Sequence, residues 1–150
     1  TSHFIWFSDP YAKIGLPTIF CGAFIPLSSK IKSKINIRNK NTLDKLKIFS
    51  DKKTNKIGND HFDSKVVITG DLDTATKRLL SHSKLQDELL KALEIELFMN
   101  ISLNENKIDF VPDFKGVPYL AIINPQSWTL DRNDIEVIFK QIEKIRNLIN

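Results

Sequence analysis

The segment from Asp60 to Asp63 holds the residue types that could bind a divalent cation. Two carboxylates and the imidazole of His61 lie within four residues, and such groups are common metal ligands. A metal site also needs ligands from elsewhere, and the chain has only 3 histidines in all. We therefore favour a structural interpretation, in which the segment is a loop, Phe62 is buried and Asp63 accepts hydrogen bonds from backbone amides before a strand. The sequence predicts no metal site.

Two other groups resemble catalytic residues but have a simpler explanation. Asp71 and Asp73 are paired carboxylates, yet they precede a helical pattern, where the positive N-terminal amides favour acids. Cys21 lies in an apolar run that is typical of a buried, inert thiol. The 5 glycines are scattered, without a nucleophile elbow or a phosphate loop. We predict no catalytic residue and no cofactor, with an unrecognised hydrolase-like enzyme as the alternative.

One predicted strand, residues 30–38, carries a basic surface. Two sets of residues alternate along it, with Ile31, Ser33, Ile35 and Ile37 on one face and Lys30, Lys32, Lys34, Asn36 and Arg38 on the other. Strict alternation is typical of a half-buried strand, so the first set should face the core and the second set should face solvent. The next predicted strand, residues 43–49, adds two lysines. The predicted binding residues are Lys30, Lys32, Lys34, Arg38, Lys45 and Lys47.

The basic surface suits an anionic partner, either an acidic membrane surface or an acidic protein. Residues 1–70 hold 12 basic and 5 acidic residues, whereas residues 71–150 hold 10 and 13. Nucleic acid is a less favoured partner, because this face lacks the aromatic residues on which bases stack. The competing interpretation is a solvated lysine face that protects the sheet from aggregation.

The composition is that of one globular domain. The chain has 150 residues, of which 41% are hydrophobic and 27% are charged; this fits a single core. A single cysteine excludes an internal disulfide and is compatible with a reducing cytoplasm. The longest apolar run, residues 14–27, contains Pro17 and Pro26 and is too short to span a bilayer. We expect a cytoplasmic domain, with any membrane anchor in a segment outside this chain.

Periodicity and capping signals predict an α+β fold, in which helices pack on a mainly antiparallel sheet. Large apolar residues near the N-terminus indicate that residues 1–16 are held on the core. The predicted strands are residues 18–25, 30–38, 43–49, 65–69 and 117–123, with a hairpin over 99–110. Helices are predicted at 72–81, with Asp71 or Asp73 as the cap, and at 84–96, with a capping box from Ser83 to Gln86. The last is predicted at 132–148, with Asp131 as the cap and Leu130 and Ile135 as a hydrophobic staple.

Residues 57–111 resemble an uncharacterised family of bacterial domains. The similarity consists of Gly58, Phe62, Asp63, Val66, Asp71, Ala75, Leu79, Leu80, Leu89 and Leu90, which are mostly core positions. It implies a strand, a short acidic turn and two leucine-rich helices. Because such domains often lie beside transmembrane helices, it also implies a membrane neighbourhood, but it implies no chemistry. Together with the basic surface, it favours a non-catalytic module of a membrane-associated protein.

Overall fold

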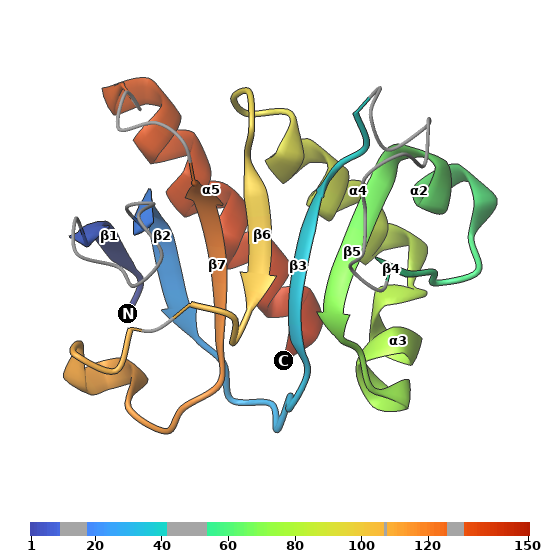
Figure 1. Ribbon diagram of the computed structural model, residues 1–150, viewed down its shortest axis with the longest axis horizontal. Coiled ribbons are helices and arrows are strands. Elements are labelled where there is room, and N and C mark those ends of the chain that lie inside the picture. The colour runs from blue at the N-terminus through green and yellow to red at the C-terminus, as the bar shows by residue number, and fades with distance from the viewer. Residues whose placement is uncertain (10–17, 42–53, 107, 126–130) are drawn as a thin grey trace.

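The computed structural model describes residues 1–9, 18–41, 54–106, 108–125 and 131–150 (Figure 1). Within these residues the chain forms a seven-stranded antiparallel sheet with helices packed against it. The predicted α+β class is therefore confirmed.

The sheet joins strands that are far apart in the sequence. Its strands are β1 (His3–Asp9), β2 (Thr18–Pro26), β3 (Lys34–Asn39), β4 (Thr54–Asn55), β5 (Val66–Asp71), β6 (Asn100–Leu103) and β7 (Tyr119–Asn124). The spatial order is β1-β2-β7-β6-β3-β5-β4, and every described pair is antiparallel. The predicted strand over 43–49, with Lys45 and Lys47, lies outside the described residues.

The longest helices cover one face of the sheet and lie behind it in Figure 1. The helices are α2 (Asp60–Lys65), α3 (Thr74–Leu80), α4 (Ser83–Leu93) and α5 (Arg132–Ile149), with a short 3₁₀ helix, η1, over Pro112–Phe114. The apolar stripe of α5 packs on the strands through Ile138, Ile142 and Ile145, which are all fully buried. The sheet thus covers the apolar stripe of this helix.

A second, smaller core lies on the opposite face. It consists of Ile5, Phe20, Phe24, Ile108, Phe114, Tyr119, Ala121 and Ile123. The chain after β6 therefore crosses this face, and the predicted hairpin over 99–110 is wrong. Residues 108–110 form no strand, and β6 pairs instead with β3 and β7. Ile108 and Phe110 are two residues apart, a spacing that would place both on one face of a strand, but Ile108 is buried and Phe110 is exposed.

The capping signals were confirmed at two helices and wrong at a third. Asp73 caps α3, and Asp131 forms a capping box with Asp134 at the start of α5; Leu130 of the predicted staple lies outside the described residues. Helix α4 has His82 at its cap position and no side-chain cap, so the predicted box at Ser83 is absent. The amide of Gln86 instead donates to the carbonyl of Leu80 at 2.9 Å, because Gln86 is buried between elements.

Candidate functional site

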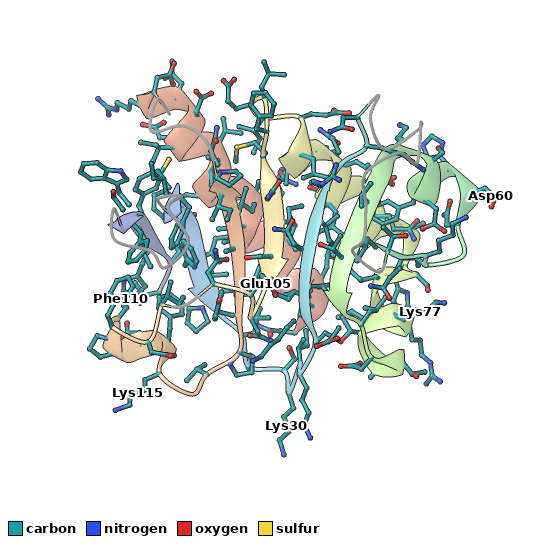
Figure 2. The ribbon with its side chains drawn as sticks, viewed as in Figure 1. Lys30, Asp60, Lys77, Glu105, Phe110 and Lys115 are labelled. Carbon is teal, nitrogen blue, oxygen red and sulfur yellow. The ribbon has the colours of Figure 1, made fainter. Side chains whose placement is uncertain are left out.

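Three exposed lysines lead into β3, and we call Lys30, Lys32 and Lys34 the basic rim. Their side chains alternate with those of Ile31, Ser33 and Ile35, which are buried as predicted. In Figure 2, Lys30 projects away from the molecule at its lower end. Among the described residues, none of the three lysines forms an ion pair within 4.0 Å. The rim therefore presents its charge to solvent.

The strand is shorter than predicted, because residues 30–33 lie outside β3. In this segment, the Asn104 side chain provides hydrogen bonds of the kind that a neighbouring strand provides within the sheet. The amide of Asn104 donates to the carbonyls of Ile31 at 3.2 Å and Ser33 at 3.0 Å, and its oxygen accepts from the Tyr119 amide at 2.9 Å. Asn104 adopts a left-handed backbone with φ of 54°, which asparagine tolerates better than most residues. These hydrogen bonds hold residues 30–33 so that buried and exposed side chains alternate, although the segment pairs with no strand of the described sheet.

Arg38 lies at the other end of β3 and is separate from the rim. It is half-buried, and its guanidinium donates to the carbonyl of Asn39 at 3.1 Å. Four residues of strand place it about 13 Å from Lys34, beyond a Debye length of about 8 Å at physiological salt. Arg38 is therefore less exposed than predicted. At physiological salt its charge is also screened from the charges of the rim.

A polar recess of about 280 Å³ adjoins the rim. It is lined by Lys32, Ser33, Asn55, Gly70, Asp71, Leu72 and Asp73. A second recess of about 220 Å³, lined in part by Lys30 and Ile31, shares Asp73 with the first. Asp71 lies opposite Lys34 in the ladder between β3 and β5, so it offsets part of the charge of Lys34. Lys32 shares the first recess with Asp71 and Asp73, and these carboxylates offset part of its charge as well.

Ser33 and Asp73, which both line the recess, form a reciprocal pair. The Ser33 hydroxyl donates to Asp73 Oδ2 at 2.8 Å and accepts from the Asp73 amide at 2.9 Å. Asp73 Oδ1 accepts from the Thr76 amide at 2.7 Å. These bonds, first that from Thr76 and then that from Ser33, hold the pKa of Asp73 below its ordinary value. Both groups therefore join the segment before β3 to the start of α3, which supports the predicted capping role of Asp73 over a catalytic one.

Replacement of Asp73 by alanine should destabilise the protein in a pH-dependent way. At neutral pH, loss of the cap should lower the free energy of unfolding by about 1–2 kcal/mol. Because the pKa of Asp73 is lowered in the folded state, its contribution is full above about pH 4 and fades as the pH falls through the folded pKa. Urea unfolding of both proteins at neutral and acidic pH measures this. A difference that stays constant with pH would contradict the capping argument.

In the segment around His61, Phe62 and Asp63 have the structural roles predicted for them. Phe62 is fully buried, and the Asp63 carboxylate accepts from the amides of Ile57 at 3.0 Å and Gly58 at 2.9 Å. Among the described residues, no group of three or more potential metal ligands comes together, and Asp60 projects outward from α2 in Figure 2. The segment is nevertheless a short helix, where a loop was predicted, because the Asn59 side chain caps the Phe62 amide at 3.1 Å.

Cys21 has the environment of a structural residue. It is buried on β2, and this burial raises the pKa of its thiol. Since the thiolate is the reactive form, a raised pKa disfavours nucleophilic chemistry. The prediction of an inert thiol therefore agrees with its surroundings.

Sequence reasoning did not find Asn55 or Asn104 as parts of this region. Asn55 lies in the recess, and its amide donates to the carbonyl of Gly70 at 2.9 Å. Asn104 was expected in a hairpin turn. The tendency of asparagine toward left-handed backbone was the one available signal, but it does not reveal which distant carbonyls the side chain reaches.

Comparison of the chain with protein-family models, curated proteins and solved structures gave no match. In the part of the chain that the structure describes, every helix is too short or too polar to cross a bilayer.

Proposed function

We propose that this domain is a non-catalytic binding module whose basic rim contacts an anionic membrane surface. The observation that supports the proposal is the exposure of three lysines whose intervening residues are buried. Burial of Ile31 and Ser33 prevents this segment from turning its other side to solvent. The lysines are thus held outward, and a flat anionic surface could approach them together.

The charge spacing supports joint action by the rim. Lys30 and Lys32 are two residues apart, which limits their Cα separation to about 7 Å, within a Debye length of about 8 Å. Each cation near an acidic bilayer contributes about 1 kcal/mol, so three contribute at most about 3 kcal/mol beside Asp71 and Asp73. That is weaker than millimolar affinity, which corresponds to about 4 kcal/mol. The rim would therefore orient a protein that a segment outside this chain holds at the membrane, which fits the neighbourhood that the resemblance over residues 57–111 implies.

Vesicle binding tests the rim directly. The native chain should bind vesicles of phosphatidylserine and phosphatidylcholine more strongly than vesicles of phosphatidylcholine alone, and added salt should remove the difference. Reversing Lys30 and Lys32 to glutamate should weaken binding at low salt by about tenfold or more, because four units of charge change at the contact. Broadening of protein NMR signals at high lipid concentration is sensitive enough for this weak affinity.

A matched variant separates the rim from net charge. Lys84 and Lys140 are exposed on α4 and α5, and reversing both also takes the formal charge from +4 to zero. We expect this control to retain more binding than the rim variant. Equal loss in both variants, or equal binding to charged and neutral vesicles at low salt, would refute the rim proposal.

The polar recess favours one alternative, an enzyme or receptor for a small polar ligand. Lys32, Asn55 and Asp71 converge there on about 280 Å³, and convergent polar groups are typical of ligand sites. A panel of ester and phosphate substrates tests it with the native chain and with Ser33→Ala. Turnover that Ser33→Ala abolishes while the fold persists would support the enzyme. Absence of turnover with the panel would favour the binding module.

A further inference from the structure

The sheet ends in two very different edges. At one edge of the described sheet, the two described residues of β4 pair with β5 at Thr69 and Ile68. At the other, β1 is seven residues long and pairs along its whole length with β2. Figure 1 shows β1 as the outermost strand on its side of the described sheet. In an antiparallel strand, alternate residues direct their N–H and C=O groups away from the partner. The outer side of β1 thus carries a long row of backbone donors and acceptors.

The composition of β1 does nothing to block pairing. Natural edge strands are protected by lysines, prolines, bulges or short length. From Phe4 to Ser8, β1 has no charged residue, proline or glycine, and its register with β2 is unbroken. β1 therefore has none of these devices in that stretch.

Apolar side chains continue to this edge on both faces of the sheet. Phe4 and Trp6 lie on the face that α5 covers, where the rings of Phe4 and Phe139 are 6.3 Å apart. Trp6 nevertheless remains 60% exposed and Phe4 37% exposed. Ile5 and Phe7 belong to the second core on the other face. A strand added beyond β1 would therefore meet apolar surface above and below its backbone.

We propose that a second copy of this chain pairs its β1 antiparallel with β1, in a twofold register centred on Trp6. This register uses all seven residues of the strand and places Trp6 opposite Trp6, Phe4 opposite Ser8, and Ile5 opposite Phe7 of the other copy. Every pair lies on one face of the sheet, as alternation requires. Directly opposed like charges would oppose self-pairing, and the stretch from Phe4 to Ser8 is uncharged. Opposed aromatic residues are among the most stabilising cross-strand pairs.

The net charge of +4 does not prevent this association. The basic rim leads into β3, which is four strands from β1 in the sheet, a separation of about 19 Å. That exceeds a Debye length of about 8 Å, so salt screens the repulsion. A twofold axis perpendicular to the sheet would place the two rims at opposite ends of the dimer. A flat bilayer would then meet one rim per dimer, and the two proposals can fail independently.

Sedimentation of the native chain and two variants tests the proposal. The native chain should show a dimer fraction that rises with concentration. Trp6→Lys should reduce the association constant by about tenfold or more, since it places two cations at the centre of the pair. Leu97→Lys is the matched control, because Leu97 is 71% exposed in the turn after α4 and the added charge is the same. This control should dimerise like the native chain.

Hydrogen exchange of the native chain locates the interface without any substitution. Amides of β1 should become more protected as concentration rises, while those of β4 should not change. This measurement holds even if Trp6→Lys does not fold. A native chain that is monomeric at every concentration would overturn the proposal. So would a dimer that Trp6→Lys leaves intact, or protection that rises elsewhere and not in β1.

Discussion

Replacement of Gly22 by alanine should destabilise the protein by about 3 kcal/mol or more, at the upper end of overpacking effects. Gly22 lies in β2 between β1 and β7, opposite Ile5 and Ile123. A Cβ atom there would lie 2.1 Å from the backbone oxygen of Ile122. Because this neighbour is backbone, relief requires β2 and β7 to separate. Urea unfolding measures the loss, and the midpoint should fall by about 1–2 M.

Gly116→Ala is the control for this effect. Gly116 has a φ of 71°, and a Cβ atom there would meet nothing within 4 Å. Its replacement should therefore cost only the left-handed conformation, about 1–2 kcal/mol. If Gly116→Ala were as damaging as Gly22→Ala, the close approach of β2 and β7 would not be the cause.

Phe62→Ala should cost about 3–5 kcal/mol, the range for removing a buried phenylalanine side chain. Phe62 is 1% exposed, and it packs with Ile57 and Val66 in the core between the sheet and the helices. The free energy of unfolding of a typical domain is only about 5–15 kcal/mol, so the variant should lose a large part of its stability. Thermal and urea unfolding of the variant measure the loss.

His61→Ala is the control beside it. His61 is exposed, and an exposed side chain of this kind usually changes stability by less than about 0.5 kcal/mol. A large loss in His61→Ala, or zinc-dependent stability that this substitution removes, would restore the metal interpretation of the segment. A small loss would leave Phe62 and Asp63 as its structural residues.

Local patterns predicted local structure well where the deciding contacts are close in the sequence. Capping of α3 by Asp73 and of α5 by Asp131 follows from residues within one turn. Burial of Ile35 and Ile37 follows from the period of a strand. The prediction at Ser83 failed because Gln86, its expected partner, bonds to Leu80 and Asn59 instead. A capping motif cannot show that a neighbouring element competes for the same side chain.

The sequence by itself determined the α+β class, the capping of α3 and α5 and the outward position of Lys30, Lys32 and Lys34. These depend on periodicity and on short-range hydrogen bonds, which neighbouring residues specify. Only the tertiary structure decided that β6 inserts between β3 and β7, that Asn104 holds the rim, and that Ser33 meets Asp73. It alone left β1, with its exposed Trp6, at the edge of the sheet. Pairing between distant strands depends on the whole packed core, and no local pattern encodes that choice.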